Sequence, residues 1–255
     1  MLRVIVAGVT GWVGKPLAEE IQRADDLRLV GAIARGAAGQ TFGDVTIVAS
    51  AEDALADPAD VFVDYTSAAV VKMNVLTAVR KRVHVVVGSS GLTDADFASI
   101  HDEAVSAGVG VLAVGNFAIT AALLQKFAVE AAKYLPTWEV IDSAYAGKMD
   151  APSGTARELA SKLSRVRTPE VEVPIENTVG LSEARGAEVN GSRIHSIRLP
   201  GYTIGLEVRF GRLDERLTIS YDGGTGAGPY IAGTMLAIRK VPQFTGVVRG
   251  MDQIL

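Results

Sequence analysis

Short runs of apolar residues that recur between helical patterns constrain the fold of this chain more than any other feature of its sequence. Helical patterns at Pro16–Ile21, 68–81 and 93–107 separate the runs. The runs are apolar rather than alternating, which is typical of a parallel sheet covered by helices on both faces. The strand candidates are Val4–Ala7, Leu27–Ala34, Thr46–Val48, Val61–Asp64, Val83–Gly88 and Val109–Val114. The first part of the chain is therefore predicted to be an α/β domain with a doubly wound parallel sheet.

The pattern changes after Asn116. A long helical stretch covers residues 118–135, and the later strand candidates alternate between polar and apolar residues. These candidates are Ser192–Arg198, Leu206–Phe210 and Arg216–Tyr221. Alternation predicts an antiparallel sheet with one open face.

A glycine-rich segment, Asp222–Pro229, breaks the chain before a last helical pattern at 230–240. We interpret the loop Gly223–Gly228 as a hinge, with a contact to a ligand as the alternative, and expect the last helix to return to the first domain. The sequence therefore predicts one domain of residues 1–116 and 230–255 and a second, α+β domain of residues 117–229 with a mainly antiparallel sheet.

Composition and charge exclude several classes of function. The chain has 255 residues, of which 48% are hydrophobic, so it can bury a sizeable core. It has no cysteine, and its three histidines, His84, His101 and His195, are too scattered to predict a metal site. A net charge of -4 with interspersed signs provides no basic stripe for nucleic acid. No apolar run approaches the roughly 20 residues of a membrane span, and the first residues do not resemble a signal peptide, so we expect a cytoplasmic location and no membrane partner.

Three glycines follow the first strand directly, in the segment Gly8-Val9-Thr10-Gly11-Trp12-Val13-Gly14. Glycines at such a turn let the backbone approach a pyrophosphate, which lies on the helix N-terminus. The spacing is G-x-x-G-x-x-G and not G-x-G-x-x-G, and a purely structural turn is the alternative. Its position at the first strand–helix turn favours a Rossmann-type dinucleotide site formed by Gly8, Thr10, Gly11, Trp12, Val13 and Gly14. Trp12 would either cover the cofactor or close the helix N-terminus.

The end of the second strand indicates which dinucleotide is used. NAD enzymes usually carry an acidic residue there for the ribose hydroxyls, whereas this chain has Ala34 and Arg35. An arginine without the acid favours a 2′-phosphate, so we predict NADPH, with NADH still possible. The alternative for Arg35 is a solvated loop residue.

A second candidate anion site is the segment Lys148-Met149-Asp150-Ala151-Pro152-Ser153-Gly154-Thr155-Ala156. A strand-like run, Trp138–Tyr145, leads to one cation, a proline and then Ser-Gly-Thr at the start of a helical pattern. Backbone N–H groups and the positive end of the helix dipole would face the lysine, so a carboxylate or phosphate fits there. The alternative is an ordinary helix cap.

Five segments together resemble the dihydrodipicolinate reductases, which reduce a cyclic imino dicarboxylate with NAD(P)H. They are Gly8–Gly14, Asp64-Tyr65-Thr66, Val87-Gly88-Ser89-Ser90-Gly91, Gly115-Asn116-Phe117 and, most specifically, Lys148–Ala156. The resemblance implies that the first domain binds the cofactor and the second binds the substrate and other subunits of a homotetramer. The implied nicotinamide and ribose contacts are Tyr65, Thr66, Gly88, Ser90, Asn116 and Phe117. The implied contacts to a substrate carboxylate are Lys148, Ser153, Gly154 and Thr155.

Several positions depart from the family pattern. The family has a His-His pair before the lysine, whose first member is the proposed proton donor, and this chain has Ala144-Tyr145. Two further histidines of the second domain correspond to Leu206 and Tyr221, and the Gly-Arg-Met-Gly of the phosphate turn corresponds to Gly11–Gly14. The nucleotide groove and one carboxylate site are kept, so cofactor use is better supported than the usual substrate.

The remaining residues still allow a reduction. Reducing a C=N or a conjugated C=C needs a hydride, a cation that holds and polarises the acceptor, and a proton. Lys148 can supply the cation, and a charged Lys148 close to Tyr145 would make that phenol a better acid. We therefore predict Lys148 and Tyr145 as the catalytic residues, with water as the alternative proton source. His195 is a further candidate acid, with an edge-of-sheet residue as its simpler interpretation.

Three functions follow from this sequence. The first is an NADPH-dependent oxidoreductase that reduces the imine or enamine of a small, carboxylate-bearing substrate. The second is a genuine 4-hydroxy-tetrahydrodipicolinate reductase of lysine and diaminopimelate biosynthesis that takes its proton from water. The third is a catalytically silent NADP-binding sensor.

Overall fold

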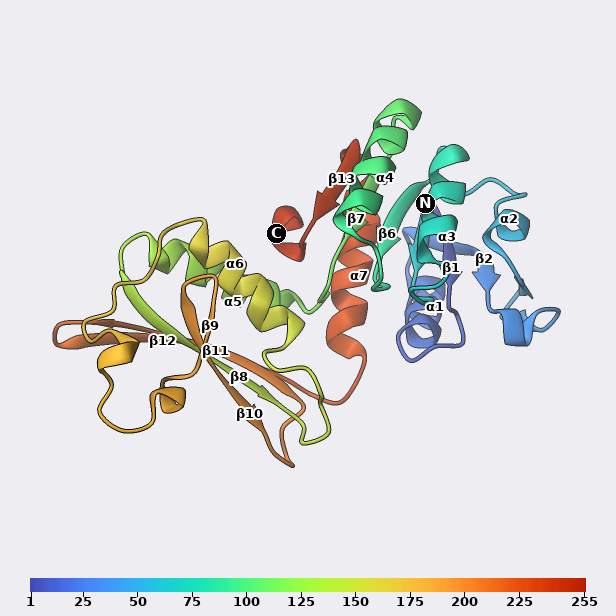
Figure 1. The fold of residues 1–255 in the computed structure, drawn as a ribbon. Coiled ribbons are helices and arrows are strands. Elements are labelled where there is room, and N and C mark those ends of the chain that lie inside the picture. Colours follow the sequence, from blue (N-terminus) through green and yellow to red (C-terminus); the bar gives the residue numbers. More distant parts are fainter. The chain divides into compact units, whose positions relative to one another are not determined.

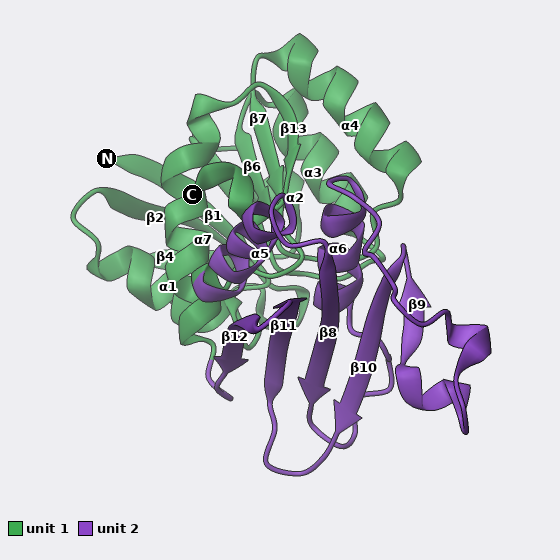
Figure 2. Cartoon of the chain, turned by 90° about the vertical axis from the view of Figure 1, so that its left-hand side faces the viewer, with its two compact units in different colours: residues 1–119, 227–255 green, residues 120–226 purple.

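Two sheets organise the 255 residues, all of which the computed structural model describes. The chain divides into unit 1, residues 1–119 with 227–255, and unit 2, residues 120–226 (Figures 1 and 2). No helix combines the length and the apolar content that crossing a bilayer requires.

Unit 1 is built on an eight-stranded sheet in the order β13-β7-β6-β5-β1-β2-β4-β3 (Figure 1). All neighbouring pairs are parallel except β3 and β4. The strands are β1 (Leu2–Ala7), β2 (Leu27–Ile33), β3 (Thr41–Phe42), β4 (Val45–Val48), β5 (Val61–Asp64), β6 (His84–Val87), β7 (Gly110–Ala113) and β13 (Gly246–Arg249). The doubly wound parallel sheet predicted from the apolar runs is therefore confirmed.

Helices cover both faces of this sheet, as strands without polar faces require. The helices α2 (Ala51–Ala54), α3 (Val71–Arg80) and α4 (Asp94–Ala107) share one hydrophobic core with the strands. The helices α1 (Gly14–Arg23) and α7 (Gly228–Lys240) contact each other on the other face. The last helix, α7, belongs to unit 1.

Some boundaries differ from the sequence-based ones. The strands β3 and β13 were not predicted, because β3 has only two residues and β13 has only two apolar residues between a glycine and an arginine. Helix α7 begins at Gly228, so Pro229 lies in its first turn and not in the glycine-rich segment. Proline fits that position because the first helical N–H groups have no intrahelical partner.

Unit 2 carries a five-stranded sheet in the order β12-β11-β8-β10-β9 (Figure 2). Its strands are β8 (Thr137–Ala144), β9 (Ala187–Val189), β10 (Ser192–Arg198), β11 (Ile204–Arg212) and β12 (Glu215–Gly223). The helices of this unit are α5 (Ile119–Ala132), whose first residue belongs to unit 1, and α6 (Gly154–Ser164).

The sheet of unit 2 is antiparallel except for one pair. Strands β8 and β10 run parallel, with Ser196 opposite Asp142. Alternation could not reveal this, because it reports which face is buried and not the direction of a strand. On the other side of β8, Leu206 lies opposite Asp142, and Tyr221 lies opposite Leu206.

Candidate functional site

The residues predicted to bind the cofactor lie at one edge of the sheet of unit 1. They follow the carboxyl ends of five strands that are neighbours in the order β7-β6-β5-β1-β2. Ligands of doubly wound sheets bind in this position. The residues are Gly8–Gly14 after β1, Arg35 after β2, Tyr65 and Thr66 after β5, Gly88 and Ser90 after β6, and Asn116 and Phe117 after β7.

The turn after β1 requires two of its glycines for steric reasons. Gly8 has a φ of +86°, and a Cβ there would lie 2.2 Å from the Tyr65 carbonyl oxygen. A Cβ at Gly14 would lie 2.0 Å from the Gly8 carbonyl oxygen. The Gly11 N–H donates to that same oxygen at 2.9 Å. The turn is therefore tight, and residues 10–12 remain exposed in front of α1.

The N-terminus of α1 is open. Its N-cap residue, Val13, supplies no side-chain acceptor, so the positive end of the helix dipole is not compensated there. Trp12 packs edge-on against Tyr230 of α7, with 5.5 Å between the ring centroids. Trp12 thus closes the turn against a neighbouring helix and is still 60% exposed.

The loop after β2 carries a cation where NAD enzymes carry an acid. Arg35 is exposed at the start of a short 3-10 helix, Arg35–Ala37, and Ala34 precedes it. The Gly8 N–H donates to the Ile33 carbonyl at 2.9 Å, so the end of β2 lies beside the glycine turn. A cation and no carboxylate at this position fits a 2′-phosphate.

The Tyr65 ring packs against the loop that follows β6. A Cβ at Gly88 would lie 2.2 Å from the Tyr65 ring, so only glycine fits there. The Tyr65 hydroxyl forms a 2.6 Å hydrogen bond with Thr234 of α7, and its ring lies 5.8 Å from the Phe117 ring. Burial raises the pKa of the Tyr65 phenol well above its usual value, so this hydroxyl stays neutral.

Asp64 organises the loops after β5 and β6, and sequence reasoning assigned it no role. Its carboxylate is fully buried. Oδ1 accepts hydrogen bonds from the Thr66 N–H at 3.0 Å, the Thr66 hydroxyl at 2.7 Å and the Ser89 hydroxyl at 2.6 Å. Oδ2 accepts one from Asn74 at 2.8 Å. The Thr66 hydroxyl therefore donates its hydrogen bond within the protein. The signal in the sequence that could have revealed Asp64 is an acidic residue at the end of the apolar run 61–63.

The remaining predicted cofactor residues differ in accessibility. Ser90 is exposed, whereas Asn116 is half-buried and its Oδ1 accepts a hydrogen bond from the Ala118 N–H at 2.9 Å. The Phe117 side chain is buried, and a Cβ at Gly233 of α7 would lie 1.8 Å from the Phe117 carbonyl oxygen. Phe117 is therefore packed inside unit 1 and presents almost no surface to a ligand.

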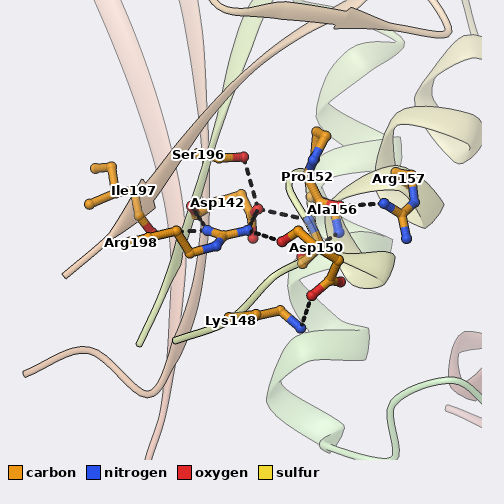
Figure 3. A network of polar contacts seen from close by, with 10 residues as sticks. Asp142, Lys148, Asp150, Pro152, Ala156, Arg157, Ser196, Ile197 and Arg198 are labelled. Atoms are coloured by element: carbon orange, nitrogen blue, oxygen red, sulfur yellow. Dashed lines mark hydrogen bonds and ion pairs between the residues drawn. The ribbon is translucent and has the colours of Figure 1, made fainter. Parts of the chain in front are cut away.

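The predicted substrate site is a loop of unit 2 between β8 and α6. The Lys148 ammonium forms a 2.7 Å ion pair with Asp150, and this contact lowers the pKa of Asp150 (Figure 3). Tyr145 is 52% exposed, and its ring lies against Gly147. The Tyr145 carbonyl accepts the Lys148 N–H at 3.1 Å, so a turn joins the two residues. The partner of the Lys148 ammonium is thus Asp150 and not the Tyr145 phenol.

The start of α6 has one capped and two open positions. Ser153 is the buried N-cap residue, and its hydroxyl accepts a hydrogen bond from the Ala156 N–H at 3.2 Å. The expected alternative, an ordinary cap, thus describes the Ser153 side chain. Gly154 and Thr155 are the first two helical residues, whose N–H groups have no intrahelical acceptor. Gly154 is exposed, and a Cβ there would meet nothing within 4 Å.

A buried ion pair lies behind this loop and was missed by sequence reasoning. Asp142 of β8 pairs with Arg198 of β10 at 2.7 Å, and the Asp142 side chain is 0% exposed (Figure 3). Burial, the strongest influence, raises the pKa of Asp142, but hydrogen bonds from Arg198 and Ser153 outweigh it and hold the pKa below its usual value. Asp142 therefore remains ionised.

The other residues considered for proton transfer lie elsewhere in unit 2. His195 forms a 2.8 Å contact with Glu139, which in turn pairs with Arg185. His195 lies opposite Ile141, one position from the Ser196–Asp142 pair, so it faces the other side of the sheet from Asp142. Leu206 is buried opposite Asp142 on β11, and Tyr221 is buried opposite Leu206 on β12. No histidine among these three residues therefore lies on the face of the sheet that carries Asp142.

Two family models together match nearly the whole chain. Residues 2–117 match the family described as dihydrodipicolinate reductase, N-terminus. Residues 120–255 match the family described as dihydrodipicolinate reductase, C-terminus.

Individual proteins give the same result. The chain is 36% identical to a 4-hydroxy-tetrahydrodipicolinate reductase of Desulfitobacterium hafniense over 264 residues, which cover 100% of this chain and 98% of that protein. It is 36% identical to one of Halalkalibacterium halodurans over 264 residues, covering 100% of both. A solved structure of dipicolinate-bound dihydrodipicolinate reductase from Paenisporosarcina sp. TG-14 superposes with a TM-score of 0.91 at 28% identity, covering 100% of both chains.

Proposed function

Because the chain belongs to the dihydrodipicolinate reductase family and is an NAD(P)H-dependent oxidoreductase, we propose that it reduces the C=N bond of a small substrate that carries a carboxylate. The observation that carries this proposal is the loop between β8 and α6, where Lys148 precedes two open backbone N–H groups, those of Gly154 and Thr155. Such groups bind an anion through charge-assisted hydrogen bonds and the helix dipole.

The cofactor side of the proposal rests on unit 1. The open N-terminus of α1 and the tight turn at Gly8 and Gly14 fit a pyrophosphate, and Arg35 without a neighbouring acid fits a 2′-phosphate. We therefore propose NADPH as the preferred cofactor and NADH as the weaker one. When bound, the reduced nicotinamide supplies the hydride.

The substrate side rests on unit 2. The Lys148 ammonium would exchange Asp150 for the substrate carboxylate and polarise the acceptor nitrogen. Gly154 and Thr155 would donate their N–H groups to the same carboxylate. Ser153 holds the helix start through its cap, so we propose that it positions this site and does not bind the substrate through its hydroxyl.

The proton for the nitrogen has two candidate sources. Tyr145 is exposed at the end of β8, and its turn places it three residues before Lys148. Ala144, its neighbour, is fully buried and carries no acid. We propose that the Tyr145 phenol donates the proton, with water as the alternative.

A second candidate function is the reaction for which the relatives are named, the reduction of 4-hydroxy-tetrahydrodipicolinate. Full-length relatives at 36% identity are named 4-hydroxy-tetrahydrodipicolinate reductase, and a structural relative holds dipicolinate. The missing His-His pair at Ala144-Tyr145 is the feature against the same substrate here. The third function, a silent sensor, is set aside because the family is one of NAD(P)H-dependent oxidoreductases.

Loss of NADPH absorbance tests these functions directly. Freshly generated 4-hydroxy-tetrahydrodipicolinate is compared with cyclic imines that carry or lack a carboxylate. We expect turnover only with carboxylate-bearing imines, and equal turnover of imines without a carboxylate would contradict the proposal. Turnover of the dipicolinate precursor, together with rescue of a lysine auxotroph, would establish the second candidate.

We also propose a homotetramer formed through the open face of the sheet of unit 2. Exposed apolar side chains lie around this sheet, among them Leu213, Leu217 and Val173. Light scattering after size exclusion measures the mass, and a monomer at working concentration would refute this assembly. A cytoplasmic location likewise stays a prediction, which cell fractionation checks.

A further inference from the structure

The buried pair of Asp142 and Arg198 makes contacts that an ordinary structural ion pair does not need. Asp142 Oδ2 accepts the Ser153 N–H at 2.8 Å, which holds the residue before α6. Arg198 Nη2 donates to the same Oδ2 and to the Asp150 carbonyl, both at 2.7 Å. One ion pair therefore holds both ends of the segment 150–153 against β8 and β10 (Figure 3).

The net contribution of a buried ion pair to stability does not explain why these two residues are charged. A buried ion pair contributes little net stability, because the desolvation of both charges offsets their attraction. Here two of its polar atoms, Asp142 Oδ1 and Arg198 Nε, are buried without a hydrogen-bond partner. The apolar side chains of Leu206 and Val140 pack in the same buried layer. The contribution of the pair is thus to geometry more than to stability.

The pair also determines which groups remain for an anion. Asp142 and Arg198 neutralise each other, so neither charge is offered to a ligand. Asp142 accepts the hydrogen bond of the Ser153 N–H, and the Ser153 hydroxyl accepts that of the Ala156 N–H. The groups left at the start of α6 are the Gly154 and Thr155 N–H groups, and Lys148 lies two residues before the held segment.

We propose that Asp142 and Arg198 are positioning residues that fix the segment 150–153 and so align Lys148 with the open N–H groups of Gly154 and Thr155 for a substrate carboxylate. This proposal rests on the proposed function of that loop. Arginine is required because its planar guanidinium serves a carboxylate and a carbonyl at the same time, whereas a lysine ammonium is a point charge.

The test uses the full-length protein with Arg198→Lys and Asp142→Asn. Arg198→Lys keeps a cation beside Asp142 and removes the fork that reaches the Asp150 carbonyl. Asp142→Asn keeps the size of the side chain and removes its charge. If Asp142→Asn fails to fold, Arg198→Lys carries the test alone.

Two controls separate positioning from general destabilisation. Val140→Ala removes buried volume from the same strand without touching the loop. Ser196→Ala removes a 3.1 Å hydrogen bond to Asp142 Oδ2 while both contacts to the segment 150–153 stay. Thermal unfolding of all four variants shows how far each is destabilised.

The first readout is hydrogen exchange of the hydrogen-bonded backbone N–H groups of Ser153, Ala156 and Arg157, which needs no substrate. We expect exchange there to accelerate by about tenfold in Arg198→Lys and Asp142→Asn, and to stay unchanged in the two controls. Unchanged exchange in the folded Arg198→Lys variant would overturn the proposal.

The second readout is affinity for the site. Dipicolinate serves as the probe in calorimetry, beside the KM of a carboxylate-bearing imine. We expect both constants to rise by about tenfold or more in the two variants, with kcat affected less and the Kd of NADPH unchanged. Faster exchange with unchanged affinity would overturn the link between the pair and the anion site. If the wild-type protein neither binds dipicolinate nor reduces an imine, the proposed function fails, and the exchange readout still decides whether the pair fixes the segment.

Discussion

Asp64 and Ser89 form a 2.6 Å hydrogen bond that ties the end of β5 to the loop after β6. The Asp64 carboxylate is fully buried, and its other donors are Thr66 and Asn74. The shape of two neighbouring loops at the cofactor edge therefore depends on one carboxylate that acts only as an acceptor.

We expect Asp64→Asn to weaken NADPH binding. The amide would direct N–H donors at the groups that now donate to Asp64, so part of the network would be broken. Losing hydrogen bonds to a buried charged group costs about 1.5–3 kcal/mol each, and a Kd raised at least about tenfold follows. Titration of NADPH fluorescence measures it.

The matched control is Asp60→Asn, on the loop that precedes the same strand. Asp60 accepts two side-chain hydrogen bonds from Arg3, and hydrogen bonding to Arg3 holds its pKa below the usual value despite an opposing effect of burial. This variant should lose some stability and keep its NADPH affinity. Equal loss of affinity in both variants would show that Asp64 acts only through folding.

The contact between Gly14 and Gly8 gives a second prediction. A Cβ at Gly14 would lie 2.0 Å from a backbone oxygen, which cannot rotate away. We expect Gly14→Ala to cost about 1–3 kcal/mol of unfolding free energy and to weaken NADPH binding, as measured by urea unfolding and titration. Gly36→Ala is the control, because a Cβ there meets nothing within 4 Å. A Gly14→Ala variant as stable as the wild type would contradict the tight turn.

The fold could be predicted from local patterns where burial alone decides. Strands such as Val61–Asp64 are buried on both faces, so their sequence is apolar and their parallel arrangement follows. The strand β3 has only two residues, which is too short for a pattern. The parallel pairing of β8 with β10 depends on the connection between them and leaves no trace in either strand.

The site could be predicted where its residues are contiguous and not where they are distant. The glycine turn and the segment Lys148–Ala156 are each written in one stretch of sequence. Asp142 and Arg198 are 56 residues apart, and Asp64 and Ser89 are 25 apart. Only the register of the sheets brings such pairs together, so a single sequence offered no signal for their roles.

Arg35 carries a prediction on cofactor choice. We expect Arg35→Ala to raise the KM of NADPH by about ten- to hundredfold, since a hydrogen bond to a charged group contributes about 1.5–3 kcal/mol. The KM of NADH should stay unchanged, because NADH has no 2′-phosphate. Arg28→Ala, at an exposed position of β2, the strand before Arg35, is the control. Equal effects on both cofactors would remove Arg35 from the phosphate site.

The lowered pKa of Asp96 gives a prediction of how the stability of the protein depends on pH. Hydrogen bonds from Lys72 and Thr93 lower its pKa from 3.8 to about 2, against a smaller effect of burial. A carboxyl group whose pKa is lowered by folding stabilises the protein above the unfolded pKa, and this stabilisation is lost as the pH falls from 3.8 towards 2. Asp96→Asn should therefore flatten the acid limb of stability measured by urea unfolding, and Asp102→Asn in the same helix should not. An unchanged acid limb in Asp96→Asn would refute this assignment.

Lys148 and Tyr145 separate binding from proton transfer. Lys148→Met leaves Asp150 without its partner and removes the cation, so the KM of a carboxylate-bearing imine should rise by at least about tenfold while the Kd of NADPH stays the same.

Tyr145→Phe keeps the ring against Gly147 and removes only the hydroxyl. If this phenol is the acid, kcat should fall by about a hundredfold or more with little change in KM. Tyr134→Phe, on an exposed tyrosine outside the site, is the control for steady-state kinetics. A Tyr145→Phe variant with the kcat of the wild type would assign the proton to water, and the carboxylate site at Lys148 would stand independently of that result.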